Sequence, residues 1–300
     1  MTKREFLTTS IGAGLALAEA RAALAQRSSG IEARRSEGPS SEKTSNRKIK
    51  TTKMFKSPPG YPNAIAVTPE GLWIGEQKMS GAGAVTYHLP EPKSLEEKAW
   101  LVDWNGKILK TVVTPSRNTS GMAVGGGYVW MIANAPPEGV FQVDMNSKLV
   151  SHRQIPLGTP TDGGGCHGGM WHDGKLWIAS LRLRGLLRID PTTWQPEFMI
   201  PFYQAPGRTR YHGMAWDNGA IWQVVGNDCK RYADYQPALV KYDAATGKVL
   251  EVVDFVPGSS DPHGLAMHDG ALISCDAGIH PGWPNNDSPT AGWIFQIDFI

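Results

Sequence analysis

Apolar residues occur in short runs separated by Gly and polar residues, and one arrangement of these positions repeats five times along the chain. Each copy opens with a polar residue and a short apolar run. A Gly then precedes a second apolar run, and a large apolar residue lies ten positions after the opening residue. The opening residues are Asn63, Ser120, His167, His212 and His263, and the matching large residues are Trp73, Trp130, Trp177, Trp222 and Ile273. A repeat of about fifty residues is typical of propellers and solenoids.

Each copy holds four short segments with the composition of β-strands. The Gly between the first two segments predicts a tight hairpin turn. The third segment ends in an Asp, whose side chain can accept a hydrogen bond from the backbone two residues on and so favours a turn. These are Asp103, Asp144, Asp190, Asp243 and Asp298, and the expected fourth strands span 107–113, 149–155, 197–202 and 249–255. The pattern predicts an all-β fold, a β-propeller of four-stranded blades.

The last copy ends after its third segment, at Ile300, whereas residues 49–55 form an extra strand-like segment before the first copy. If this segment completes the last blade, the ring is closed by the N-terminal strand and no sheet edge is left unpaired. The sequence therefore predicts five blades. Six remain open, because residues 77–98 are long enough to contain a further hairpin.

The first residues have the features of an export signal. Residues 2–7, Thr-Lys-Arg-Glu-Phe-Leu, resemble the twin-arginine motif, and Ala23-Leu24-Ala25 has the small residues of a cleavage site. The alternative is an amphipathic N-terminal helix. We expect residues 1–25 to be a signal read by the Tat export machinery, residues 26–48 to be a disordered polar tether, and residues 49–300 to form the propeller domain. The mature protein is then periplasmic or secreted.

Composition narrows the choice of partners. The net charge is +2, which gives no reason to expect nucleic acid, and no segment is long and apolar enough to place the mature form in a membrane. With 41% hydrophobic residues, the chain can bury a large core. Of the three cysteines, Cys229 and Cys275 follow comparable strands and are the likelier disulfide pair, although a buried thiol is the default for each.

Histidines open three successive copies, and the first strand of a propeller blade lines the central channel. His167, His212 and His263 should therefore meet at one mouth of that channel, where neutral imidazoles can bind a metal or act as a general base. The alternative is that each imidazole bonds only to its own loop.

Acidic residues follow the large apolar position by three in the first and last copies, at Glu76 and Asp276. In a closed ring these copies are neighbours, so the two carboxylates could share a metal with the histidines; the alternative is that they cap loop amides. The same mouth should receive residues that could hold an anionic substrate, namely Asn63, Arg117, Asn118, Arg182, Arg210, Tyr211, Asn227 and His280. The alternative is that most of the arginines are salt-bridge partners within the loops.

The repeat, His-Gly-Leu-Ala followed by Gly-x-Leu-Trp-Ile, resembles the blade motif of the virginiamycin B (streptogramin) lyase family and its lactonase-like relatives. The resemblance covers roughly residues 49–300. It implies a site of two histidines and a glutamate beside a magnesium ion, which opens a cyclic ester by elimination. His212, His263 and Glu76 occupy the matching positions, whereas the longer blades, the count of five, Asp276 and His167 depart from the family.

From residues and resemblance together, we expect a metal-dependent lyase or hydrolase with catalytic His212, His263 and Glu76 and with metal ligands drawn from His167, His212, His263, Glu76 and Asp276. The cofactor is a divalent ion, either magnesium, zinc or another transition metal. The substrate is a small molecule, anionic or lactone-like. A non-catalytic propeller that binds a ligand or protein at the same mouth is the alternative.

Overall fold

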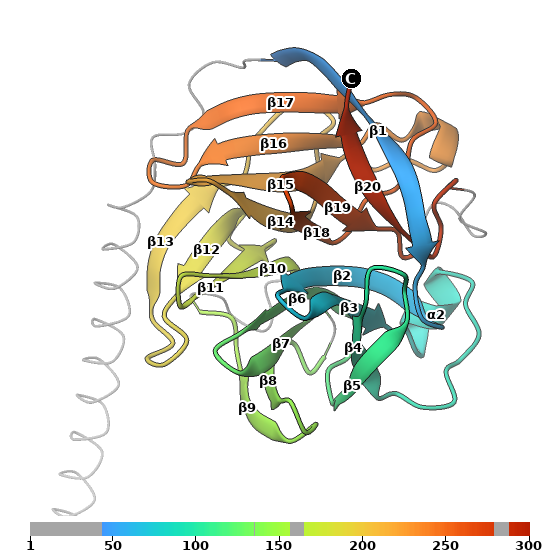
Figure 1. Ribbon diagram of the computed structural model, residues 1–300, viewed down its shortest axis with the longest axis vertical. Coiled ribbons are helices and arrows are strands. Elements are labelled where there is room, and N and C mark those ends of the chain that lie inside the picture. The colour runs from blue at the N-terminus through green and yellow to red at the C-terminus, as the bar shows by residue number, and fades with distance from the viewer. Residues whose placement is uncertain (1–43, 135, 157–164, 279–287) are drawn as a thin grey trace, which may run out of the picture.

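The computed structural model describes residues 44–134, 136–156, 165–278 and 288–300, and these residues form β-sheets joined by loops (Figure 1). The first sheet is β2 (Tyr61–Thr68), β3 (Gly71–Gln77), β4 (Glu97–Val102) and β5 (Ile108–Thr114). The second is β6 (Thr119–Gly125), β7 (Tyr128–Ala133), β8 (Gly139–Asp144) and β9 (Leu149–Arg153). The third is β10 (Cys166–His172), β11 (Lys175–Ser180), β12 (Gly185–Ile189) and β13 (Pro196–Pro201). Each is an antiparallel meander in chain order.

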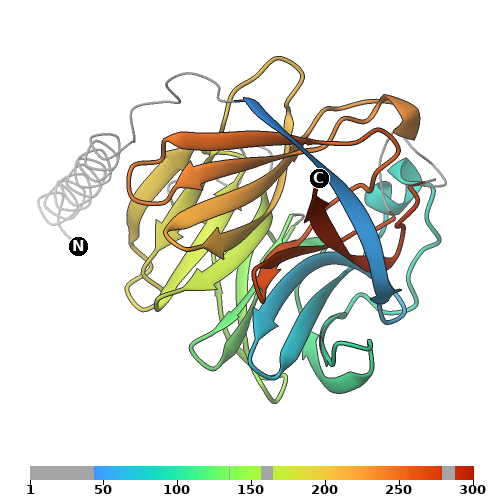
Figure 2. The same ribbon diagram turned by 45° about the horizontal axis from the view of Figure 1, so that its top comes forward.

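The two remaining sheets are joined through the N-terminal strand. The fourth is β14 (Arg210–Asp217), β15 (Ala220–Gly226), β16 (Ala238–Asp243) and β17 (Val249–Phe255). The fifth is β18 (Leu265–His268), β19 (Ala271–Cys275), β20 (Trp293–Phe299) and β1 (Thr44–Lys56). β1 pairs antiparallel with β20, as the sequence predicts, and also parallel with β17. Figure 2 shows β1, in blue, crossing beside the dark red end of the chain.

β1 begins at Thr44, so residues 44–48 belong to a strand and not to a disordered segment. Two ion pairs account for the added strand residues, because Arg47 lies 2.5 Å from Glu251 and Lys48 lies 3.5 Å from Asp254 on β17. The segment 77–98 holds the short helix α2 (Ala82–Thr86) and, between Lys78 and Glu96, no strand. The hairpin of a sixth blade is therefore absent from that segment.

Inner strands of successive sheets approach one another closely. β2 contacts β6, β6 contacts β10, β10 contacts β14, β14 contacts β18, and β18 contacts β2. A Cβ atom on Gly213 would lie 2.6 Å from the carbonyl oxygen of His263, and one on Gly264 would lie 2.7 Å from the amide nitrogen of Ile65. A Gly follows the opening residue in four of the five copies because the next inner strand fills the space that a side chain would need.

The large apolar residue of each copy packs between its own sheet and the next. Trp177 belongs to a core cluster that joins the third and fourth sheets, and Trp222 to one that joins the fourth and fifth. Ile273 packs with residues of the first sheet, including Ile65 and Ile74. These clusters between faces of four-stranded antiparallel sheets make the molecule all-β and consistent with a β-propeller.

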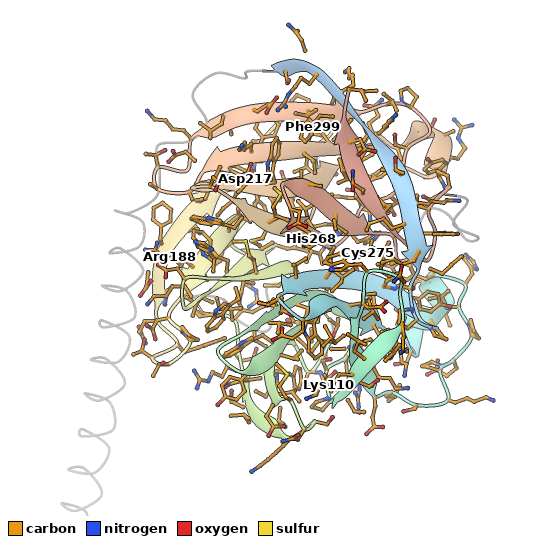
Figure 3. The ribbon with its side chains drawn as sticks, in the orientation of Figure 1. Lys110, Arg188, Asp217, His268, Cys275 and Phe299 are labelled. Atoms are coloured by element: carbon orange, nitrogen blue, oxygen red, sulfur yellow. The ribbon has the colours of Figure 1, made fainter. Side chains whose placement is uncertain are left out.

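Two further expectations concern turns and cysteines. Asp103, Asp144, Asp190 and Asp243 each accept hydrogen bonds from backbone amides of the turn that follows, as predicted. Cys275 is a buried free thiol between the fifth and first sheets (Figure 3), so the Cys229–Cys275 disulfide is not formed. In the described part of the chain, no helix is long and apolar enough to cross a membrane.

Candidate functional site

The opening residues of the five repeats meet around one small cavity of about 40 Å³. They reach it because each lies near the start of an inner strand and because those strands converge. The lining residues are Asn63, Gln77, Met79, Tyr87, Ser120, Asn134, His167, Arg210, His212 and His263. A cavity of this size accommodates one or two water molecules, an ion or the head group of a ligand, and is too small for a whole metabolite.

Three imidazoles form a contiguous group at this cavity. The ring centres of His167 and His212 are 5.0 Å apart and nearly parallel, and those of His212 and His263 are 4.7 Å apart. Burial lowers the pKa of His167 to about 3 and that of His263 to about 4. Both rings are therefore neutral near pH 7, the state in which imidazole binds metals and accepts protons.

His167 is held by hydrogen bonds on its own side of the cavity. Its Nε2 lies 2.6 Å from Nδ2 of Asn134, and its ring also hydrogen bonds with the backbone of Tyr211. Asn134 Nδ2 can only donate, so Nε2 accepts the hydrogen bond and the ring proton resides on Nδ1. This arrangement fixes the orientation of His167 and leaves His263 as the histidine closest to carboxylates.

Asp261, which lies two residues before His263, completes a buried group that the repeat register did not indicate. Ligand atoms of Asp261, His263 and Asp276 all lie within 4.8 Å of one another. Nδ1 of His263 lies 3.0 Å from the carbonyl oxygen of Asp261 and donates to it, so Nε2 is unprotonated and lies 3.8 Å from Oδ2 of Asp261. A metal-binding histidine commonly has this second hydrogen bond to a carbonyl group.

The two aspartates differ in their surroundings. Asp276 accepts hydrogen bonds from Ser288 at 2.5 Å, from Thr290 at 3.0 Å and from the amide of Gly278 at 2.8 Å. Oδ2 of Asp261 is buried and has no hydrogen-bond donor among the described residues. Burial raises the pKa of Asp261 to about 6, opposed by Arg210, and burial together with the neighbouring Asp261 raises the pKa of Asp276.

Arg210 brings a buried positive charge to the same cavity. Its Nη1 lies 3.5 Å from Oδ1 of Asp261, and its guanidinium carbon lies 5.3 Å from the ring centre of Tyr235. The nearby Tyr235 also lowers the pKa of Asp261. Asp261, with the other acidic groups nearby, raises the pKa of Arg210 despite its burial. The guanidinium group is thus positioned to bind an anion.

Glu76, the predicted partner of Asp276, is directed elsewhere. Its carboxylate lies 3.6 Å from Nζ of Lys78, and its side chain fills the space beside Gly60. The neighbouring Gln77 lines the cavity instead, accepting a hydrogen bond from Asn63 at 2.6 Å. Successive side chains of a strand point to opposite faces, so Gln77 faces the cavity and Glu76 does not.

A second pocket of about 320 Å³ adjoins the cavity and contains two of the predicted substrate residues, Arg117 and Asn118. Met79 lines both spaces. It packs with Ala277 and, less deeply, with Tyr61, Tyr87 and Leu89, so the segment after β3 covers the cavity. No feature of the sequence beyond the length of this segment pointed to Met79.

The other predicted binding residues are engaged by groups of the protein itself. Arg182 pairs with Glu138 at 3.3 Å, and Tyr211 donates to backbone carbonyl groups of Tyr203 and Arg208. Asn227 donates to the carbonyl of Asp234 and accepts from the amide of Gln236. His280 lies outside the described residues.

Comparisons with known proteins identify a fold and no family. No protein-family model matches the sequence, and no curated protein matches it. Among solved structures, the chain is similar to a glutaminyl cyclase from Myxococcus xanthus, with a TM-score of 0.54 and 12% identity over 84% of this chain and 97% of that chain.

Two weaker similarities are to hydrazine synthase from Kuenenia stuttgartiensis and to a protein of unknown function from Bacteroides caccae. The first has a TM-score of 0.45 and 16% identity over 73% of this chain and 56% of that chain. The second has a TM-score of 0.44 and 12% identity over 77% and 83%. At these identities the similarity shows the fold alone, and the function must be argued from the site.

Proposed function

We propose that the five sheets are the blades of a closed five-bladed propeller. The contact between β18 and β2, and the lack of space for a side chain at Gly264 beside Ile65, support closure between the fifth and first sheets. Pairing of β1 with β20 supplies the fourth strand of the last blade. The small cavity is then one mouth of the central channel.

We propose further that the protein is a metal-assisted enzyme, a lyase or an ester or lactone hydrolase, that acts on a small molecule at this mouth. The observation that carries the proposal is the buried group of Asp261, His263 and Asp276, directly beside His212 and Arg210. Glu76 is not part of the proposed ligand set, because its side chain is directed towards Lys78.

The residues of this group fit a divalent cation. They offer two carboxylates and one imidazole, whose tautomer leaves Nε2 available. One of the carboxylate oxygens, Oδ2 of Asp261, has no hydrogen-bond donor among the described residues. Two buried carboxylates beside one arginine leave an excess negative charge, which a cation would compensate. A mixed oxygen and nitrogen donor set suits zinc or manganese, and also admits magnesium.

Asp261, His263 and Asp276 would hold the ion, which would supply the means to activate water or polarise a carbonyl group. His212 lies between His167 and the ligand His263 and lines the cavity, so its imidazole is placed to move a proton at a bound substrate. This arrangement serves hydrolysis and elimination alike, and ring opening of a cyclic ester can proceed by either route.

Metal content of the purified protein tests this function. We expect one divalent ion per chain by elemental mass spectrometry, and a loss of at least tenfold in metal affinity in Asp261→Asn and His263→Ala. His212→Ala should retain the metal and lose turnover of lactone and ester substrates. Folded protein without stoichiometric metal would contradict the proposal and favour a non-catalytic binding propeller.

Labelled water separates the two reaction types. Hydrolysis in H₂¹⁸O places one labelled oxygen in the acid product, whereas elimination forms an alkene and incorporates none. Mass spectrometry of the product of a cyclic ester therefore assigns the reaction class.

We also propose export through the Tat pathway to the periplasm or beyond. Support comes from the Lys-Arg-Glu-Phe-Leu motif and from Ala23-Leu24-Ala25. Mass spectrometry of the mature protein from its native cell should find an N-terminus close to Gln26. Recovery of the uncleaved chain from the cytoplasm would contradict this proposal.

A further inference from the structure

We infer that the ligand of this site carries a carboxylate group and that Arg210 is the residue that selects it. The inference rests on the proposed function, because it requires the cation held by Asp261, His263 and Asp276. It goes beyond that function by naming the chemical class of the substrate and the side chain that binds its carboxylate group.

The first argument is the unused hydrogen-bonding capacity of Arg210. A guanidinium group has five N–H donors in a planar fork that matches a carboxylate. Nη1 makes a long ion pair of 3.5 Å with Asp261, and the described residues provide no other side-chain hydrogen bond to Arg210. The side chain is nevertheless almost buried, with 12% of its surface exposed, and it lines the cavity.

The second argument is the charge of the occupied site. Asp261 and Asp276 contribute two negative charges, which a divalent cation would cancel. The charge of Arg210 is then left over in a buried setting, where an uncompensated charge is costly. A monoanionic ligand brings the site to neutrality, whereas a neutral ligand does not.

The third argument is the size of the two spaces. The cavity of about 40 Å³ accommodates a head group such as a carboxylate, and the rest of the ligand must lie elsewhere. The adjoining pocket of about 320 Å³ begins at Met79 and is lined in part by Leu95, Pro136 and the cationic Lys78 and Arg117. A small monocarboxylic acid or its acyl derivative, with a short apolar chain lying across Met79, fits both spaces.

Paired probes of equal shape test this inference. Hexanoate and hexanamide differ in charge and match in size, and their binding to the full chain loaded with one equivalent of Zn²⁺ can be measured by calorimetry. We expect hexanoate to bind at least about tenfold more tightly than hexanamide. Removal of the metal with a chelator should abolish most of that preference.

Two substitutions place the effect at Arg210. Arg210→Met should weaken hexanoate binding at least about tenfold and leave hexanamide unchanged. Arg210→Lys keeps a charge beside Asp261 and so protects the fold, yet loses the planar fork, and should weaken hexanoate severalfold. Arg184→Met is the control for the loss of one positive charge, because Arg184 is exposed and bonds to Gln204.

The results separate this inference from the proposed function. Stoichiometric zinc with equal binding of the two probes, or with hexanoate binding unaffected in both Arg210 variants, overturns the inference and leaves the metal site standing. Absence of bound zinc overturns both.

Discussion

At the scale of single residues, the repeat register predicted which strand residues line the same cavity. It did not predict the loop residue Asp261, which lies beside them. Asn63, His167, His212 and His263 line one cavity, because residues at the same position of successive inner strands must converge where those strands converge. Asp261 lies two residues before its strand position and was missed, since loop conformation rather than periodicity brings it beside His263. Periodicity likewise did not separate Glu76 from Gln77.

The charge of Asp261 should appear in the pH dependence of stability of the metal-free protein. Its pKa rises from 3.8 to about 6 on folding, so the folded state holds this proton more tightly than the unfolded state. The ionised carboxylate therefore destabilises the fold above pH 6, and this penalty is lost as the pH falls from 6 towards 3.8. Between pH 7 and pH 5 the residue should add about 1 kcal/mol to the free energy of unfolding.

Urea unfolding of Asp261→Asn in the presence of a chelator measures this contribution. Relative to the variant, the unsubstituted protein should gain about 1 kcal/mol on going from pH 7 to pH 5. Asp269→Asn, at a side chain 89% exposed, controls for the loss of one carboxylate. An equal change with pH in the unsubstituted and Asp261→Asn proteins would contradict the assigned cause.

At the scale of elements, the sequence predicted the positions of the strands but not the conformation of the loops. The expected fourth strands match β5, β9, β13 and β17 to within two residues, because alternating side chains and turn-forming Asp residues are local signals. The segment between β3 and β4 was open to a hairpin and contains α2 instead. Its place over the cavity depends on Met79 packing against Ala277, a contact between distant parts of the chain that no local pattern encodes.

The inner strands should tolerate no side chain at the Gly that follows the opening residue in four of the five copies. In Gly213→Ala, the new Cβ would lie 2.5 Å from the amide nitrogen of Leu265 and 2.6 Å from the carbonyl oxygen of His263. Both are backbone atoms, so the strands must separate, and Gly213 also donates a hydrogen bond of 2.7 Å to that carbonyl. We expect a loss of about 1–3 kcal/mol in the free energy of unfolding, measured by denaturant titration.

Gly83→Ala is the matched control for this prediction. Gly83 lies in α2, and its new Cβ would be no closer than 3.8 Å to Met79. Ala favours helix over Gly by about 1 kcal/mol, so the control should be neutral or stabilising. A Gly213→Ala protein as stable as this control would show that the inner strands are not in contact.

At the scale of the whole molecule, β1 holds two sheets together. Deletion of residues 46–56 removes the strand that pairs with both β20 and β17, along with the buried side chains of Ile49 and Phe55. Each such side chain contributes about 1.5–3 kcal/mol when buried, so we expect a loss of several kcal/mol and a lower midpoint of thermal unfolding.

Point variants of β1 separate packing from chain length. Ile49→Ala should cost about 2–5 kcal/mol, whereas Lys50→Ala, at an exposed position of the same strand, should change stability by less than about 0.5 kcal/mol. Unchanged thermal unfolding after the deletion would contradict the role given to β1 in holding the fifth sheet.

Pairing of β1 with β20 also has a consequence for how the chain reaches its native state. Thr51 is opposite Ile297, a sequence separation that spans nearly the whole domain, so this ladder can form only after the last strand has left the ribosome. Contacts between such distant residues carry a large loop-closure entropy and slow folding. During synthesis the four sheets from β2 to β17 can assemble by local hairpins, while β1, which is made first, stays unpaired until β17 and β20 have been made. An unpaired strand is a template for pairing with other chains, so we expect aggregation of newly made protein to begin at β1.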